Sequence, residues 1–383
     1  MSLWWSSKLT KFTVALAVLA SGMAFAQEVN RGKKSPGDDA NEPFPRIEVS
    51  KFIVMPMASS HSDWVEAIRG ARKSIHMEMF HVTEKAVIDA LVARAHDNID
   101  MRVIVDHKII GGYKAAFDTL SSAGVKIRAA SAFYSITHSK TMIVDNSVAW
   151  ITSINMTNTG TSSRDFGILT PDTAIIAEID KVFESDWTAA GDNANVDTTP
   201  AVNHPNLAWS PTNSTNQLVK LIDSAKDTLD LEVENIGSQD ILDALNRAAS
   251  PERKVQVRVI IPQCSGNNPN NYAALKKLKG IQTHVEHDGK SLDQPYLHAK
   301  MIVVDKKRNY IGSINFSYNS TVKSRELGVI FLDEDIGGKL SQEFKTDWDR
   351  SVAPADPPEC GKTGGNGSGG SSDSVNDLVG DAA

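Results

Sequence analysis

Two copies of one residue pattern carry the chemistry of this chain. Each copy places a histidine two residues before a lysine, at His138 and Lys140 and again at His298 and Lys300. Displacement at a phosphodiester needs an attacking group and a proton donor, and two histidines can divide these tasks. The pair therefore predicts phosphodiester chemistry.

Both copies continue with a polar turn and a second apolar segment. This succession predicts a β-hairpin, and residues two apart on a strand share a face, so each hairpin gathers an imidazole, an ammonium, a hydroxyl and an amide on one side. The matching residues lie 160 positions apart, which predicts a duplicated fold. The further residues of the pattern are Asp145, Ser153 and Asn155 in the first copy and Asp305, Ser313 and Asn315 in the second.

This arrangement resembles the signature of the phospholipase D superfamily, which contains His-x-Lys-x4-Asp-x6-Gly-Ser-x-Asn twice. The second copy matches at every position, including Gly312, whereas the first has Thr152 in place of this glycine. Glycine relaxes backbone geometry near the phosphate, so the departure concerns the shape of the first half-site rather than its chemistry. The family also has an acidic residue after the asparagine, and here Asp165 and Glu326 correspond to it.

The resemblance implies a covalent phosphohistidine mechanism. One imidazole attacks phosphorus, and the other protonates the leaving alcohol and then activates the incoming water or alcohol. The family more often uses the amino-terminal histidine as the nucleophile, so we expect His138 to attack and His298 to act as the acid; the residues alone do not distinguish the two. Asp165 and Glu326 are expected to bind the remaining ring nitrogens and fix the tautomer.

Side chains are also expected to hold the phosphate. Cationic and amide donors stabilise the charge that spreads over a five-coordinate transition state, so we expect neither a metal ion nor a cofactor. Asp145 and Asp305 are expected to shape their turns. Glu78 and Glu232, inside apolar strands, either line the site or pair with a buried base. The expected phosphate donors are Lys140, Lys300, Asn155 and Asn315.

Internal similarity extends upstream of the motifs and predicts two α/β halves. The apolar strands predicted at 74–79 and 228–233 are offset by 154 residues, and a helix is expected after each. Strands that alternate with helices predict an α/β/α sandwich, and the resemblance implies two pseudo-symmetric halves with one shared active site. The predicted organisation is a signal peptide at 1–26, a linker at 27–48, half 1 at 49–190, a linker at 191–205, half 2 at 206–352 and a flexible tail at 353–383.

The amino-terminal residues predict export. Lys8 and Lys11 precede a short apolar stretch, and a small-x-small site ends at Ala26, which together are typical of a cleaved signal peptide. We expect a secreted or periplasmic protein; an uncleaved anchor is the alternative, and the short apolar run disfavours it. In an oxidising compartment Cys264 and Cys360 form a disulfide or stay as two thiols.

Composition and motif neighbours bear on the substrate. The chain has 40 basic and 47 acidic residues, whereas nucleic-acid-binding proteins usually show a basic surplus. Aromatic residues beside the motifs, among them Tyr134, Tyr296 and Phe316, suit a membrane interface or ordinary packing. We expect a phospholipid at a membrane surface to be hydrolysed to phosphatidic acid and a free headgroup, with transfer to other alcohols left open. The alternatives are a nonspecific endonuclease and an inactive binding module. A duplicated chain can act as a monomer.

Overall fold

The computed structural model describes residues 42–57, 61–108, 113–158, 162–191, 194–197, 199–263, 268–286 and 291–355, without the side chains of 268 and 269. The predicted signal peptide, Cys264, Cys360 and most of the predicted tail lie outside the described residues. The folded unit starts at Glu42, six residues before the predicted end of the linker. Phe44 is fully buried in it, and burying a phenyl side chain contributes roughly 1.5–3 kcal/mol. Residues 42–48 are therefore part of the fold, because the buried side chains of Phe44 and Ile47 outweigh the polar composition around them.

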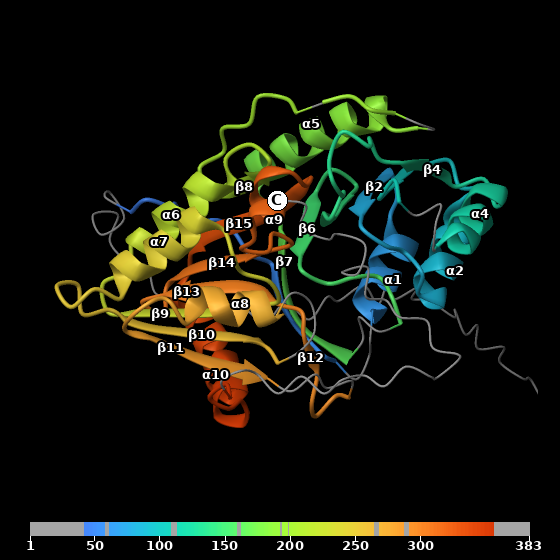
Figure 1. Cartoon of the computed structure of the whole chain (residues 1–383). Coiled ribbons are helices and arrows are strands. Elements are labelled where there is room, and N and C mark those ends of the chain that lie inside the picture. The colour runs from blue at the N-terminus through green and yellow to red at the C-terminus, as the bar shows by residue number, and fades with distance from the viewer. Residues whose placement is uncertain are drawn as a thin grey trace, which may run out of the picture. The chain divides into compact units, whose positions relative to one another are not determined.

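Half 1 forms a mixed sheet with helices on both faces (Figure 1). The strand order is β1-β7-β6-β5-β2-β3-β4, in which β2, β3 and β4 are parallel and the remaining pairs are antiparallel. The elements are β1 (Lys51–Met55), α1 (Ser62–Gly70), β2 (Ser74–Met79), α2 (Lys85–Arg94), β3 (Asp100–Val105), α4 (Lys114–Ser122), β4 (Lys126–Ala129), β5 (Lys140–Val144), β6 (Val148–Thr152), β7 (Ser163–Thr170) and α5 (Thr173–Ala189).

Half 2 repeats this topology, with the strand order β8-β15-β14-β13-β9-β10-β11. The duplicated α/β fold predicted from the sequence is therefore present. The elements are β8 (Leu207–Ser210), α6 (Ser214–Asp223), β9 (Thr228–Val233), α7 (Gln239–Ala248), β10 (Gln256–Pro262), α8 (Asn268–Leu275), β11 (Ile281–Glu286), β12 (Tyr296–Leu297), β13 (Lys300–Val304), β14 (Arg308–Gly312), α9 (Tyr318–Val322), β15 (Glu326–Leu332) and α10 (Glu334–Arg350).

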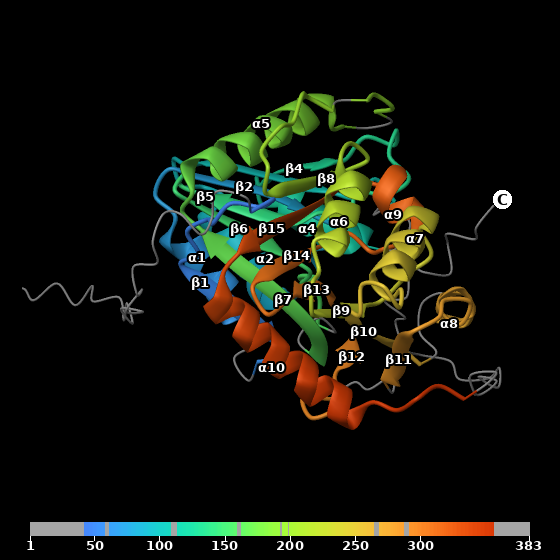
Figure 2. The ribbon, with the colours of Figure 1, turned by 90° about the vertical axis from the view of Figure 1, so that its left-hand side faces the viewer.

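Three apolar clusters hold the layers together. One packs the half 1 sheet against α1, α2 and α4, and another packs the half 2 sheet against α6 and α7. The third combines side chains of β5, β6 and β7 with those of β13, β14 and β15, and includes α5 and α10. Figure 2 shows α5 and α10 on opposite sides of the strands. The two halves thus share a continuous core. None of the helices among the described residues is long and apolar enough to span a membrane.

Both predicted motif hairpins are present, and an aspartate shapes each turn as expected. Asp145 and Asp305 adopt positive φ angles of 55° and 52°, as tight hairpin turns require. The Asp145 carboxylate accepts backbone N–H groups of residues 72–74, and Asp305 accepts those of residues 226–228. Each aspartate therefore fastens its hairpin to the start of the neighbouring strand and does not reach the motif histidine.

The first hairpin accommodates the Thr152 side chain, which stands where the family pattern has glycine. It pairs with Gly167 across the sheet, where an added Cβ would lie 2.6 Å from Thr152 Cγ2. Thr152 Oγ1 donates to the Lys140 carbonyl at 3.2 Å and accepts from the Ile154 N–H at 3.2 Å. In half 2 both paired positions are glycine, Gly312 and Gly328. The departure from the family pattern therefore leaves the strand pairing unchanged.

Candidate active site

Strand contacts between the halves place each motif histidine beside the acidic strand of the other half. Thr137 forms a parallel bridge with Arg325, and the His138 N–H donates to the Arg325 carbonyl at 2.9 Å. Reciprocally, β12 pairs with β7, and the His298 N–H donates to the Arg164 carbonyl at 3.2 Å. The residue after each arginine is the predicted carboxylate. Backbone pairing between the halves thus places each carboxylate next to the motif histidine of the other half.

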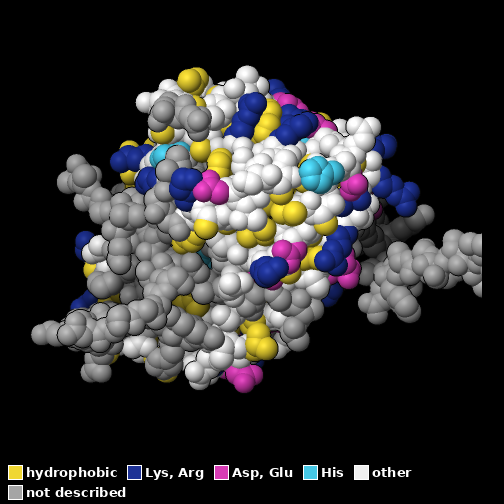
Figure 3. Space-filling model, turned by 90° about the vertical axis from the view of Figure 1, so that its right-hand side faces the viewer, with side chains coloured by type: hydrophobic (Ala, Val, Ile, Leu, Met, Phe, Trp, Pro, Cys, Tyr) yellow, Lys and Arg dark blue, Asp and Glu magenta, His cyan; other side chains and the backbone are white. Residues whose placement is uncertain are grey.

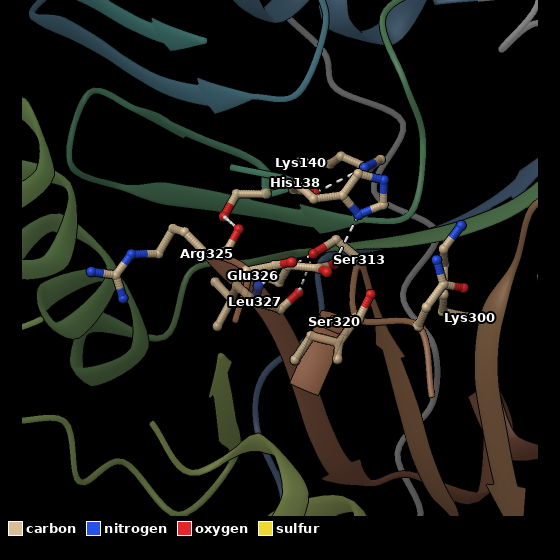
Figure 4. A network of polar contacts seen from close by, with 12 residues as sticks. His138, Lys140, Lys300, Ser313, Ser320, Arg325, Glu326 and Leu327 are labelled. Atoms are coloured by element: carbon tan, nitrogen blue, oxygen red, sulfur yellow. Dashed lines mark hydrogen bonds and ion pairs between the residues drawn. The ribbon is translucent and has the colours of Figure 1, made fainter. Parts of the chain in front are cut away.

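The resulting histidine–carboxylate pairs are crossed. His138 Nδ1 lies 2.9 Å from Glu326 Oε2, and Figure 4 shows the ring directed at this carboxylate with Lys140 beside it. His298 Nδ1 lies 2.9 Å from Asp165 Oδ1. An Nδ1–H that donates to a carboxylate leaves the Nε2 lone pair available to react. Each motif histidine therefore takes the partner of its Nδ1 atom from the other half.

Hydroxyl groups hold both carboxylates. Ser153 Oγ donates to Asp165 at 2.5 Å, and Ser163 supplies a second hydroxyl. Ser313 and Ser320 hydrogen-bond to Glu326 in the same manner (Figure 4). Burial raises the pKa of Glu326 to about 8, although Lys140 and the two hydroxyls oppose the rise. The predicted supporting serines therefore orient the carboxylates.

The lysines and asparagines of both copies converge on the two rings. Lys140 Nζ donates to the His138 carbonyl at 2.9 Å, and Lys300 Nζ donates to the His298 carbonyl. Asn155 Nδ2 lies 3.4 Å from His298 Nε2, so a half 1 amide reaches the half 2 imidazole. All eight predicted catalytic side chains thus belong to one cluster, and this donor set can surround a tetrahedral phosphate.

His138 lies in surroundings that favour its neutral form. Burial lowers its pKa well below the ordinary value, and the nearby charges of Lys140, Lys300 and His298 lower it further. Phe80 packs edge-on against the His138 ring, with centroids 4.8 Å apart, and Lys140 Nζ lies 5.3 Å from the phenyl centroid. Burial also lowers the pKa of Lys140 to about 7, with Lys300 as the next cause. A neutral imidazole is the form that can attack phosphorus.

Glu234 also belongs to the cluster, although the sequence patterns did not single it out. Its Oε2 lies 2.8 Å from Lys300 Nζ, 3.3 Å from Asn315 Nδ2 and 3.7 Å from His298 Nε2. The residue follows directly after an apolar strand, without a motif of its own. Its only sequence signal is the duplication, which aligns Glu234 with Phe80 at the offset of 154 residues.

Two arginines cross between the halves and bind buried acids. Arg164 binds Asp347 of α10 through Nε at 2.8 Å, close to Glu232. Arg325 binds Asp186 of α5 at 3.0 Å, close to Glu78. Glu78 and Glu232 lie near these arginines, but Glu78 Oε1 and both carboxylate oxygens of Glu232 have no hydrogen-bond partner among the described residues. Burial raises the pKa of Glu78 to about 8, and the Asp186 charge adds to this effect.

One cluster among the described residues has the donor types of a metal site. Single ligand atoms of His76, Asp180 and Glu184 lie within 4.8 Å of one another. Arg102 binds Glu184 and lies 2.7 Å from His76 Nε2. Arg102 pairs with Glu184 and His76 pairs with Asp180, so the cluster is a polar network between the half 1 sheet and α5.

Comparison with known proteins agrees with the duplicated architecture. A family described as cardiolipin synthase, PLD-like domain, matches residues 64–187 and 218–348. Phospholipase D Z of Dictyostelium discoideum is 30% identical over 32% of this chain and 29% of its own length. Cardiolipin synthase 1 of Staphylococcus epidermidis is 30% identical over 34% of this chain, and the match covers 26% of that enzyme. The chain thus spans less than a third of either relative.

Longer matches have lower identity. Cardiolipin synthase of Clostridium perfringens is 23% identical over 76% of this chain and 68% of its own length. The structure of phosphatidylserine synthase from Haemophilus influenzae has a TM-score of 0.62 at 12% identity and covers 81% of this chain and 88% of that one. Polyphosphate kinase from Porphyromonas gingivalis has a TM-score of 0.61 at 14% identity, with 78% and 47% coverage. The two structures support the fold.

Proposed function

The chain belongs to the phospholipase D superfamily, through the cardiolipin synthase, PLD-like domain family, and on this premise we propose that it cleaves phospholipids to phosphatidic acid and a free headgroup. The observation that carries the proposal is the crossed pair of imidazoles, each bound at Nδ1 by a carboxylate of the opposite half. This arrangement provides two Nε2 atoms next to one set of lysine and asparagine donors.

In the proposed first step, His138 Nε2 attacks phosphorus and forms an N–P bond while the bond to the leaving oxygen breaks. His298 transfers its Nε2 proton to that oxygen, which departs as an alcohol. Lys140, whose ammonium lies beside the attacking ring, holds a nonbridging oxygen and stabilises the developing charge. The lowered pKa of His138 supports its role as the nucleophile, because an imidazole must be neutral to attack.

In the second step, water attacks the phosphohistidine while His298 accepts its proton. The N–P bond breaks and His138 becomes free again. An alcohol in place of this water would give transfer rather than hydrolysis, and the names of the synthase relatives favour testing for that product. Transfer to alcohols is therefore the second reaction to measure.

The proposal is tested with purified protein and phosphatidylcholine vesicles in EDTA. We expect release of choline and formation of phosphatidic acid, and a phosphorylated peptide containing His138 after acid-free quenching. Adding ethanol or glycerol to the same reaction measures transfer. No headgroup release from any phospholipid, or activity that disappears in EDTA and returns with added calcium or zinc, would contradict this mechanism.

A nonspecific endonuclease is the competing function, and the same assay with single- and double-stranded DNA tests it. A positively charged stripe along the surface is the usual footprint of nucleic-acid binding. On the face shown in Figure 3, basic and acidic side chains lie next to each other without a continuous basic stripe. The net charge of −7 points in the same direction. DNA cleavage without headgroup release would favour the nuclease.

Export and the monomeric state are further parts of the proposal. Export rests on the predicted signal peptide, and a mature amino terminus at Gln27 in the medium or periplasm would support it. The monomer rests on the completion of both histidine–carboxylate pairs within one chain. Mass measurement in solution, combined with activity at high dilution, tests this expectation.

A further inference from the structure

Phe80 and Glu234 occupy equivalent positions but have opposite chemistry. The Phe80 N–H donates to the Ser139 carbonyl at 3.0 Å, and the Glu234 N–H donates to the Ala299 carbonyl at 3.1 Å. Both acceptors are the central residue of a His-x-Lys motif. Backbone hydrogen bonding therefore places residue 80 next to the His138 motif and residue 234 next to the His298 motif. One half has a phenyl ring at this position and the other has a carboxylate.

The Glu234 carboxylate engages the donors that would hold phosphate in half 2. Its Oε2 binds Lys300 Nζ and Asn315 Nδ2, at 2.8 and 3.3 Å. Its Oε1 accepts the hydroxyl of Tyr296 at 2.7 Å. Lys140 of half 1 has no ion-pair partner of this kind among the residues that the structure describes. A phosphate at Lys140 therefore has no ion-paired carboxylate to displace, but it must compete with Glu234 for Lys300.

Glu234 is charged at any pH at which the protein works. Burial acts to raise its pKa, but the charges of Lys300 and His298 outweigh burial and hold the pKa well below its usual range. A phosphodiester is also an anion, so the two repel each other unless a further positive charge is present. Lys140 supplies one positive charge on the side of His138, and an ammonium on the substrate would supply another next to Glu234.

The geometry of displacement identifies the part of the substrate that meets Glu234. The attacking atom and the leaving oxygen lie on opposite sides of phosphorus in an in-line displacement. If His138 attacks, the leaving oxygen lies next to His298 Nε2, which is 3.7 Å from Glu234 Oε2. In a two-carbon amino alcohol the ammonium follows the ester oxygen by three bonds, so it comes within reach of this carboxylate.

We infer that Glu234 determines leaving-group specificity and selects alcohols that carry an ammonium group, such as ethanolamine, over neutral alcohols such as glycerol. The inference rests on the proposed function, because it takes His298 as the group on the leaving side. When the ammonium pairs with Glu234, Lys300 and Asn315 are released to bind the phosphate. Substrate binding and assembly of the phosphate site are thus one event.

Calorimetric binding of O-phosphoethanolamine and glycerol 1-phosphate tests the inference. We compare the wild type with Glu234→Gln, which keeps the shape and the acceptor for Tyr296 but removes the charge. Glu286→Gln is the matched control, since it removes another buried carboxylate of half 2, one that pairs with Arg350. We expect the wild type to prefer O-phosphoethanolamine and Glu234→Gln to lose about tenfold to a hundredfold of that preference, the range for a hydrogen bond to a charged group. The control should keep it.

The same three proteins are then assayed on vesicles of phosphatidylethanolamine and phosphatidylglycerol. The expected result is a matching loss in the ratio of the two kcat/KM values in Glu234→Gln alone. An unchanged binding ratio within twofold, an equal change in the control, or no binding of either compound would overturn the inference. Altered binding without any headgroup release would instead contradict the phospholipase function and leave the role of Glu234 standing.

Discussion

The two halves share one topology and one set of donors, yet the surroundings of their histidines differ. His138 has the Phe80 ring and Glu326 as neighbours, whereas His298 has two carboxylates, Asp165 and Glu234. Burial and the nearby cations favour the neutral form of His138 by lowering its pKa, whereas two carboxylates lie next to His298. The difference teaches that a duplicated scaffold gives its two histidines different surroundings by changing side chains around the rings and leaving the motif itself intact.

The strongest test of this comparison is removal of each histidine. We expect His138→Asn to lower kcat on phospholipid by at least about 10⁴-fold and to abolish the phosphohistidine, because the nucleophile is lost. His298→Asn should cost about 10² to 10⁴-fold, as loss of a general acid does. On bis(4-nitrophenyl) phosphate, whose leaving group needs no proton, formation of the intermediate should largely recover in His298→Asn only.

Rapid-quench measurement of phosphoprotein separates these cases. His96→Asn is the control, because His96 is exposed and lies on the surface of half 1. If the activated ester rescued His138→Asn instead, the roles of the two histidines would be exchanged.

We expect replacement of Glu326 and replacement of Asp165 to lower activity by unequal amounts. Burial raises the pKa of Glu326 to about 8, so its folded-state carboxyl is mostly protonated at pH 7 and Glu326→Gln changes little charge. Asp165→Asn removes the charged partner of His298 Nδ1, and losses of up to about 10⁴-fold follow such changes. We expect the Asp165 variant to lose at least tenfold more activity than the Glu326 variant. Equal losses at pH 7 would argue against the charge difference between the halves.

Replacing either of the two arginines that cross between the halves should lower the free energy of unfolding by the same amount. The arginines differ in this from the carboxylates, whose replacement should have unequal effects. Arg164→Met and Arg325→Met each leave a buried acid without its cation, and this costs about 3–5 kcal/mol of unfolding free energy. Arg247→Met, in an exposed pair with Asp223, should change stability by less than about 1 kcal/mol. Urea unfolding at pH 7 measures all three. A small effect in either buried variant would show that the halves are joined mainly by their shared apolar core.

The smallest expected effect is the pH dependence of kcat/KM. Burial and Lys300 lower the pKa of Lys140 to about 7, and only the ammonium form attracts phosphate. Activity should therefore be retained below pH 7 and fall as pH rises through that value in the free enzyme, by about tenfold per unit in kcat/KM. On the acid side, the lowered pKa of His138 should keep activity below pH 6.5.

Lys140→Arg checks the assignment, because a guanidinium stays charged throughout. We expect a lower overall rate and an alkaline limb moved to higher pH. An alkaline limb at the same pH in both proteins would assign it to another group, with Glu326, whose pKa burial raises to about 8, the first to test.

The sequence predicted the motif residues well because their relations are local. Strands β5 and β13 begin at Lys140 and Lys300, so each motif histidine lies just before its strand and not on it. The hairpin turns at Asp145 and Asp305 follow from the short-range pattern. The duplicated topology followed from constant offsets. These predictions needed no knowledge of how the halves pack.

The remaining features depend on contacts between segments far apart in the chain. Nothing local indicates that Glu326 belongs to His138, because that pairing arises from a bridge between Thr137 and Arg325. The Arg164 and Arg325 contacts were missed although both arginines directly precede the predicted acids and follow a serine. Glu234 was missed because a carboxylate at the end of an apolar strand resembles any solvated strand end until Lys300 is placed beside it.

The exchange of carboxylates between halves also has a consequence for biosynthesis. While the ribosome has released only half 1, the nascent polypeptide presents His138 without Glu326, so its imidazole lacks the partner that sets the tautomer. The pair is completed only after β15 has emerged and docked beside Thr137, so a nascent half 1 lacks this part of the cluster.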